Sequence, residues 1–228
     1  MRLLIWDFDG TLGYRVGGAW SAAMAQVVAQ ARPDLELAVS RFSPHLGSGF
    51  PWHQPEKPHT EIRDADQWWA KLRPVFARVY GALGLEPVLA AQLADQVRGV
   101  YTDPTGWRLY PDSLPTLEMF QRRGWTQVLL SNHVPELGQI LTHLGLADRL
   151  KVVYNSAETG YEKPHRQAYR QVLNAFPGCD AVWMIGDSLR ADVQGAERVG
   201  IPAILARKAS ACAGYQASDL AQVADIIC

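Results

Sequence analysis

The stretch Leu3-Leu4-Ile5-Trp6-Asp7-Phe8-Asp9-Gly10-Thr11 decides how this chain is interpreted. Four apolar residues predict a short buried strand, which ends at two aspartates and a Gly-Thr turn. Side chains two positions apart on an extended segment point the same way, so Asp7 and Asp9 should face one site. Two neighbouring carboxylates favour a bound cation or a shifted pKa. The stretch indicates metal or acid–base chemistry, and the alternative is that Asp and Gly simply end a strand.

Composition narrows the class of protein. The 228 residues are 48% hydrophobic and carry a net charge of −1, which suits one large domain or two small ones with a packed core. The absence of a basic block argues against nucleic acid as a partner, and no apolar stretch is long enough to span a bilayer. The first apolar run meets Asp7 at once, so no signal peptide is expected.

Three cysteines, Cys179, Cys212 and Cys228, lie far apart in the sequence. Their odd number and wide spacing match neither a disulfide framework nor a zinc site. A reducing cytoplasm is therefore the expected location.

From Leu109 onward, short apolar runs alternate with helical patterns. This alternation predicts an α/β fold with a parallel sheet and helices on both faces. We expect strands over 126–130, 151–154, 181–185 and 201–205. We expect helices over 113–123, from Pro135 to about 145, from Pro164 onward, and after Asp187 to about 199.

The segment between Tyr14 and Pro104 has a different character, with apolar residues at helical spacing and no convincing strand. It predicts an all-helical insertion after the first strand, so that a core of residues 1–14 and 105–228 would carry a second unit, 15–104. Residues 43–60 contain four prolines and few core-forming residues, which predicts a loop between the first two helices.

Two further polar groups occur at expected element ends. Ser131-Asn132 follows a strand, where a hydroxyl and backbone N–H groups can hold a phosphoryl oxygen; the alternative is a turn cap. Lys163 precedes a helix whose first position is Pro164, the unfavourable end for a cation, which suggests an anionic ligand or acidic partner. A solvated surface lysine is the alternative.

The last polar group follows the strand at 181–185. Asp187 lies at the carboxyl end of this strand, as Asp7 does at the first, and Asp192 is about one helical turn further on. Asp187 or Ser188 could instead cap the next helix. A second strand-end acid aimed at the same edge of the sheet favours a functional role.

Together these residues resemble the haloacid dehalogenase superfamily over the whole chain. Asp7-Phe8-Asp9-Gly10-Thr11 matches the first motif, Ser131 the second, Lys163 the third, and Asp187 with Asp192 the fourth. The insertion resembles the C1 cap of subfamily I, in members of the phosphoglycolate phosphatase type. The resemblance implies a Rossmann-like parallel sheet core with an all-helical C1 cap inserted after the first strand.

The resemblance also implies a mechanism. Asp7 would be the nucleophile that forms an aspartyl-phosphate, and Asp9 the general acid and then the general base. Mg²⁺ would be held by the carboxylates of Asp7 and Asp187 and by the backbone carbonyl of Asp9.

Other residues would bind the phosphoryl group. Ser131 and Lys163 would hold its oxygens and stabilise charge in the transition state. Asn132 and Thr11 are further phosphate-binding candidates, and Asp192 would orient Lys163 or a metal-bound water.

The implied function is a Mg²⁺-dependent phosphatase acting on a small phosphorylated metabolite, as a monomer or homodimer. The acid at Asp9 argues against dehalogenation, because a halide leaves without a proton. A phosphomutase of the β-phosphoglucomutase type carries the same motifs and is the alternative. A non-catalytic binding protein of this fold is a third possibility, which the intact acids disfavour.

The cap is expected to close over the site and to set specificity. The candidates for contacts with the substrate are Tyr14, Arg15, Trp52, His53 and Lys57. His133 is expected either to line the pocket or to lie in a turn. We expect Trp68 and Trp69 in the cap core, and no metal site at His45, His53 and His59, whose spacing fits no ligand pattern.

Overall fold

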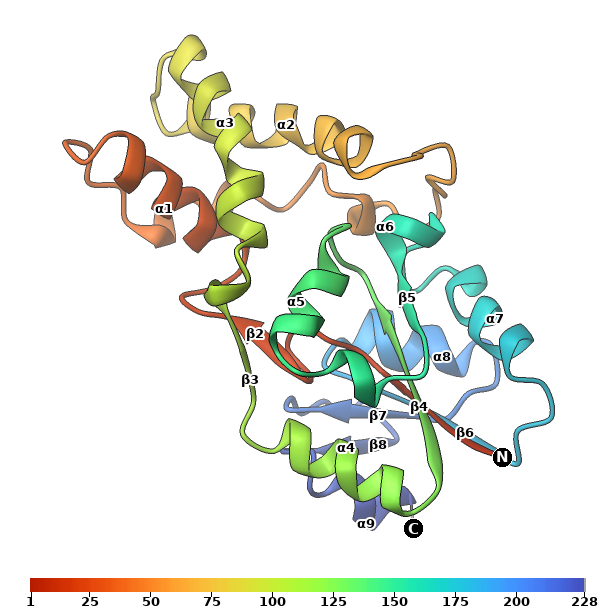
Figure 1. The fold of residues 1–228 in the computed structure, drawn as a ribbon. Helices are drawn as coiled ribbons and strands as arrows, with labels where there is room; N and C mark the ends of the chain where they lie inside the picture. The colour runs from red at the N-terminus through yellow and green to blue at the C-terminus, as the bar shows by residue number, and fades with distance from the viewer. Residues whose placement is uncertain (228) are drawn as a thin grey trace.

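A six-stranded parallel sheet forms the centre of the computed structural model, which describes residues 1–227 (Figure 1). The strand order is β5-β4-β1-β6-β7-β8, as the alternating pattern predicts for a parallel sheet. The strands are β1 (Arg2–Trp6), β4 (Trp125–Ser131), β5 (Val153–Asn155), β6 (Ala181–Gly186), β7 (Ala203–Ala206) and β8 (Tyr215–Ala217).

The register of the central strands determines where the polar strand ends meet. β1 lies between β4 and β6, and Trp6 pairs with Leu129 on one side and Ile185 on the other. The chain leaves all three strands on the same edge, because parallel strands end together. Asp7, Ser131 and Asp187 are therefore neighbours there, as expected for ligand-binding residues of an open α/β sheet.

Helices cover both faces of the sheet, because alternate residues of β1 point to opposite sides. Leu4 and Trp6 belong to one buried cluster with residues of α4, α5 and α9, and Leu3 and Ile5 to another with residues of α7 and α8. The helices are α4 (Ser113–Arg122), α5 (Leu137–His143), α6 (Ser156–Thr159), α7 (Arg166–Ala175), α8 (Gly195–Glu197) and α9 (Val223–Ile227).

Three helices lie apart from the sheet, at the top of Figure 1: α1 (Trp20–Ala31), α2 (Ala65–Ala82) and α3 (Pro87–Thr102). They are the helices that the apolar spacing predicts, and α3 packs on both of the others. Trp68 and Trp69 are buried in this group, as expected. The two-stranded antiparallel sheet of β2 (Gly13–Arg15) and β3 (Trp107–Leu109) joins the helical segment to the rest of the chain.

Several predicted boundaries are wrong by a few residues. Pro164 does not begin a helix: α7 starts at Arg166, because His165 caps it by accepting a hydrogen bond from the N–H of Gln167. The helix expected after Asp187 is a π-helical turn, Leu189–Gln194, followed by the short α8. The sequence patterns miss β2, β3 and β8, which are too short to show a period of two, and also α9.

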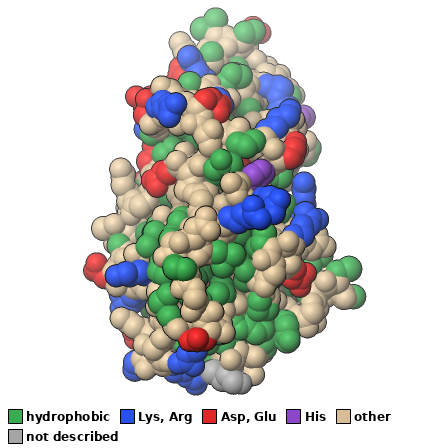
Figure 2. Space-filling view, turned by 90° about the vertical axis from the view of Figure 1, so that its right-hand side faces the viewer, with side chains coloured by type: hydrophobic (Ala, Val, Ile, Leu, Met, Phe, Trp, Pro, Cys, Tyr) green, Lys and Arg blue, Asp and Glu red, His purple; other side chains and the backbone are tan. Residues whose placement is uncertain are grey.

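The proline-rich stretch 43–60 contains no α-helix, as expected, and forms short 3₁₀ turns at Ser43–His45 and Pro51–His53. On the face drawn in Figure 2, Lys and Arg side chains gather at mid-height, where the helical segment meets the part that contains the sheet, above a broad hydrophobic area. No helix within residues 1–227 is long and apolar enough to cross a membrane. Cys179 and Cys212 are free, and Cys228 lies outside the described residues.

Candidate active site

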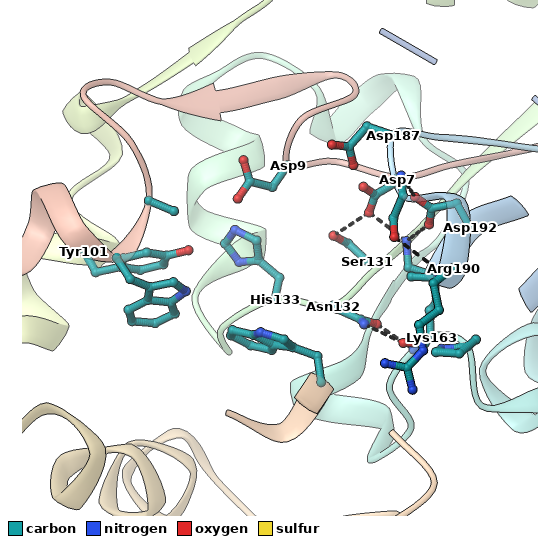
Figure 3. Close-up of a pocket in the computed structure, with 16 residues that line it drawn as sticks. Asp7, Asp9, Tyr101, Ser131, Asn132, His133, Lys163, Asp187, Arg190 and Asp192 are labelled. Carbon is teal, nitrogen blue, oxygen red and sulfur yellow. Dashed lines mark hydrogen bonds and ion pairs between the residues drawn. The ribbon is translucent and has the colours of Figure 1, made fainter. Parts of the chain in front are cut away.

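A cavity of about 440 Å³ lies at the carboxyl edge of the sheet, between the strand ends and the helical segment (Figure 3). Every predicted site residue except Thr11 lines it, namely Asp7, Asp9, Ser131, Asn132, Lys163, Asp187 and Asp192. His133 lines it too. Residues from four separate parts of the sequence thus meet at one place.

Lys163 is held between two carboxylates. Its Nζ lies 2.7 Å from Oδ1 of Asp7 and 2.6 Å from Oδ1 of Asp192, and the side chain is buried. Burial opposes the charge of Lys163, but attraction to Asp192 and Asp7 outweighs burial and raises its pKa. The structure therefore gives Lys163 acidic partners and excludes the solvated surface lysine.

Ser131 and Asn132, at the end of β4, form hydrogen bonds with Asp7 and Lys163. The Ser131 hydroxyl donates to Oδ1 of Asp7 over 3.0 Å. The Asn132 side chain bonds the backbone of Lys163 in both directions: its Nδ2 donates to the carbonyl at 2.9 Å, and its Oδ1 accepts from the N–H at 2.7 Å. Asn132 thus fixes the segment that carries Lys163.

Asp192 lines the cavity; its Oδ1 accepts from Nζ of Lys163, and its Oδ2 accepts from the N–H of Ser188 at 2.9 Å. A Cβ at Gly186 would lie 2.2 Å from this carboxylate, so the close approach requires glycine. Burial raises the pKa of Asp192 to about 7, with Lys163 opposing the shift and Asp7 adding to it.

Asp9 and Asp187 lie near other negatively charged carboxylates. Burial raises the pKa of Asp9 to about 7, and repulsion by Asp7 and Asp187 adds to the shift. Burial and Asp7 also raise the pKa of Asp187, against a 2.6 Å ion pair with Lys208. The sequence reasoning missed Lys208, although a cation two residues after β7, at the same edge of the sheet, was a usable signal.

This excess of carboxylates fits a divalent cation. Ligand oxygens of Asp7, Asp187 and Asp192 lie within 4.8 Å of one another. The backbone at Gly10 (φ +85°) passes so near Asp187 that a Cβ would lie 2.5 Å from Oδ2. Hard oxygen donors of this kind suit Mg²⁺. The third acid of this cluster is Asp192, whereas the family resemblance implies the backbone carbonyl of Asp9 as the third metal ligand. Asp192 is already bonded to Lys163 and Ser188.

Five candidate residues lie outside the cavity. The Thr11 side chain is fully buried, and its hydroxyl has no hydrogen-bond partner among the described residues, so it does not reach the cavity. Arg15 is buried and donates to the carbonyl of Val100 at 3.0 Å. Within the described chain, of the five proposed substrate contacts, Trp52 lines the cavity and Tyr14, Arg15, His53 and Lys57 do not.

The sequence reasoning did not assign Trp20, Tyr101 and Arg190 to the site, yet all three line the cavity. Trp20 and Tyr101 belong to helices with ordinary apolar spacing, so no local signal separates them from core residues. The His59 side chain meets no metal-ligand cluster within residues 1–227 and pairs with Glu162 at 3.0 Å.

Comparisons with known proteins identify relatives of this chain. The chain is 29% identical over 211 residues to haloacid dehalogenase-like hydrolase domain-containing protein 3 of Mus musculus, covering 90% of this chain and 81% of that protein. It is 33% identical over 132 residues to the phosphoserine phosphatase of Thermus thermophilus, covering 57% and 52%.

Solved structures show the same fold. The magnesium-bound HAD-hydrolase YfnB of Bacillus subtilis has a TM-score of 0.75 at 19% identity, over 99% of this chain and 98% of that chain. The 2-haloacid dehalogenase of Pseudomonas syringae has a TM-score of 0.67 at 23% identity, over 100% and 98%. The sequence model of the haloacid dehalogenase-like hydrolases matches residues 1–200. The chain belongs to the haloacid dehalogenase-like hydrolase family.

Proposed function

We propose that this protein is a Mg²⁺-dependent phosphatase that hydrolyses a small phosphorylated metabolite through an aspartyl-phosphate on Asp7. The observation that carries the proposal is the convergence of Ser131 and Lys163 on the Asp7 carboxylate, with Asp9 facing the same cavity. Similarity to a phosphoserine phosphatase, and over 101 residues at 36% identity to the ribulose-1,5-bisphosphate 5-phosphatase of Halopiger xanaduensis, supports phosphate-ester chemistry.

The reaction has two steps. A carboxylate oxygen of Asp7 attacks phosphorus, the bond from phosphorus to the leaving oxygen breaks, and Asp9 donates its proton to that oxygen. A water molecule then attacks the aspartyl-phosphate and gives a proton to Asp9. The bond between phosphorus and Asp7 breaks, which releases inorganic phosphate and restores both acids.

The attack on phosphorus requires positive charge and hydrogen-bond donors next to the phosphoryl oxygens. Lys163 and Ser131 already lie within hydrogen-bond distance of Asp7, so phosphoryl oxygens bound beside this carboxylate would meet both donors. Asp192 bonds the Nζ of Lys163 and Asn132 bonds its backbone, so both hold Lys163 in place. Because Lys163 is buried, its charge is poorly screened and acts strongly on the transition state.

Asp7, Asp187 and the backbone carbonyl of Asp9 would hold Mg²⁺. The bound cation would offset the repulsion between the Asp7 carboxylate and the incoming phosphate. Residues 15–104 would act as a C1 cap of the subfamily I, phosphoglycolate phosphatase-like type, closing over the cavity and excluding water from the first step.

The test is phosphate release from a panel of phosphorylated metabolites with Mg²⁺ and with EDTA. We expect turnover that EDTA abolishes and that Asp7→Asn lowers at least a thousandfold, while Asp148→Asn, an exposed residue outside the cavity, keeps wild-type rates. Turnover that depends on an added sugar bisphosphate would instead indicate a phosphomutase. Folded protein that releases no phosphate from any substrate would contradict the proposal.

A further inference from the structure

The cavity has two chemically different walls (Figure 3). The sheet edge contributes the acids, Lys163 and Arg190. The helical segment contributes Ala19, Trp20, Trp52 and Tyr101, so within residues 1–227 this wall carries no charged side chain. The phosphate has its partners on the first wall, and the rest of the substrate meets the second.

Asp9 indicates the direction in which the leaving group lies. In Figure 3 Tyr101 and Arg190 lie at opposite ends of the cavity, and the Asp9 carboxyl points toward His133 and Tyr101. The negative charge of Asp9 also contributes to the raised pKa of Tyr101, after burial, which agrees with this proximity. Because Asp9 protonates the leaving oxygen in the proposed reaction, the leaving group belongs at the Tyr101 end, away from Arg190.

The rings of the aromatic wall stack in pairs. Trp20 stacks on Tyr101 with ring centres 3.8 Å apart and planes 9° apart. Trp52 stacks on Phe50 at 4.8 Å and 17°. Rings fixed in this way offer flat apolar surfaces without losing side-chain entropy when a ligand binds, which favours flat partners.

His133 adds a polar point to this end of the cavity. It is buried, packs edge-on against Phe8, and neither of its ring nitrogens has a hydrogen-bond partner among the described residues. Burial lowers the pKa of His133 to about 4, so the ring is neutral near pH 7. A buried, unpartnered imidazole beside a cavity can bond a hydroxyl or other neutral polar group of a ligand.

The cations of the cavity do not favour a charged leaving group. Lys163 is paired with Asp7 and Asp192. Lys208, which does not line the cavity, is paired with Asp187. Arg190 makes no ion pair within the described chain, but it lies at the end opposite Tyr101. A carboxylate on the leaving group would therefore meet tryptophan and tyrosine rings rather than a cation, at a desolvation cost.

We propose that the leaving group of the substrate is an uncharged alcohol that carries a flat ring, packed against Trp52 and the Trp20–Tyr101 stack with a polar atom at His133. This inference rests on the proposed phosphatase function and names its substrate class. It excludes serine and glycolate, whose phosphate esters carry an additional charged group on the leaving side.

The test compares phosphate esters of similar intrinsic reactivity. Benzyl phosphate has a flat uncharged ring, cyclohexylmethyl phosphate has the same bulk without flatness, and O-phosphoserine and phosphoglycolate are charged. We expect kcat/KM for benzyl phosphate to be at least tenfold higher than for either charged ester. It should also be several-fold higher than kcat/KM for cyclohexylmethyl phosphate. Equal values for benzyl and cyclohexylmethyl phosphate, or a preference for a charged ester that Arg190→Gln removes, would overturn the proposal.

Variants of one loop locate the effect. Trp52→Ala should lower the ratio of kcat/KM for benzyl phosphate over phosphoglycolate about tenfold, and Trp52→Phe should restore most of it. Gln54→Ala, an exposed residue of the same loop outside the cavity, is the matched control and should keep the wild-type ratio. A ratio that Trp52→Ala leaves unchanged would contradict the proposal.

Binding without turnover separates this inference from the proposed function. Calorimetry with Mg²⁺ should give at least tenfold tighter binding of benzylphosphonate than of phosphonoacetate, and Trp52→Ala should remove most of the difference. Hydrolysis of acetyl phosphate that EDTA and Asp7→Asn abolish, with no preference for the benzyl ligands, would overturn the substrate class alone. Absence of any hydrolysis would contradict the phosphatase, while the two affinities would still decide the ring-binding site.

Discussion

Nε2 of His59 lies 3.0 Å from Oε1 of Glu162, and both side chains are buried. Nearby, the backbone N–H of His59 donates to the carbonyl of Gly160 at 2.9 Å. These bonds join the proline-rich loop, which carries Trp52, to the segment that carries Lys163. The loop that carries Trp52 and the segment that carries Lys163 are thus held together by two hydrogen bonds of His59, to Glu162 and to Gly160.

Removing His59 should therefore weaken both stability and substrate binding. In His59→Ala the buried Glu162 carboxylate loses its partner, which costs about 1–3 kcal/mol of unfolding free energy in urea titrations. His59→Ala should also raise KM, because the proline-rich loop that carries Trp52 is no longer held against the segment that carries Lys163. Lys71→Ala, which breaks an exposed ion pair with Glu61, is the control and should change stability by less than about 0.5 kcal/mol.

A double-mutant cycle tests the contact itself. If His59 and Glu162 act through their bond, the effects of His59→Ala and Glu162→Ala should not add. Additive losses of stability would show that the contact contributes nothing.

Asp192→Asn should reduce kcat/KM about 10–100-fold. It should also lower stability, because both oxygens of Asp192 accept hydrogen bonds and the new amide N–H₂ must face Lys163 or the N–H of Ser188. The substitution keeps the shape of the side chain but removes one of the two charges that hold Lys163. Lys163 should then bind Asp7 more tightly and meet the phosphate less well. Asp148→Asn serves as the control, and the measurement is steady-state kinetics at a temperature at which thermal melting shows both variants to be folded. Wild-type kinetics in Asp192→Asn would contradict a positioning role.

Gly10→Ala should weaken Mg²⁺ binding, because the new Cβ would lie 2.5 Å from Oδ2 of Asp187. Gly18→Ala is a matched control: Gly18 also has a positive φ, +103°, but no atom lies within 4 Å of its Cβ position. Both variants carry the backbone strain of a left-handed alanine, about 1–2 kcal/mol, and only Gly10→Ala displaces the acid. Calorimetric titration with Mg²⁺ separates them, and equal affinities would exclude Asp187 as a ligand.

His133 should make the protein less stable in acid. Its pKa falls from 6.5 to about 4 on folding, chiefly by burial. The unfolded chain therefore takes up the proton first as pH falls, and stability is full above pH 6.5 and lost between 6.5 and 4. This loss lowers the free energy of unfolding at pH 5 by about 2 kcal/mol relative to pH 7. His133→Phe should reduce the difference between urea titrations at the two pH values by that amount, and an undiminished difference would contradict the assignment.

The arrangement of Asp7, Ser131 and Asp187 was predictable, because each follows an apolar strand and parallel strands end at one edge. Lys163 was singled out by an expected helix start at Pro164, but the helix begins at Arg166, and the acidic partner Asp192 lies in a different element. The position of a site residue can be predicted from local sequence when it directly follows a strand or precedes a helix.

Contacts between distant parts of the chain were not predictable in the same way. Thr11 follows the motif, yet tertiary packing turns its hydroxyl inward. Trp20, Tyr101 and Arg190 meet in one cavity only because the helical segment lies over the sheet edge, and no spacing along the sequence encodes that distance. The strand β8 is three residues long, too short for a periodic signal.

The most direct test of the central claim is to trap the phosphoryl group on the protein. Wild-type protein mixed with Mg²⁺ and a substrate found in the panel, then quenched in acid within milliseconds, should yield a phosphorylated peptide that contains Asp7. Asp7→Asn should yield none. Phosphate release in a single turnover with no phosphorylated Asp7 at any time point, or a phosphoryl group on another residue, would contradict the account.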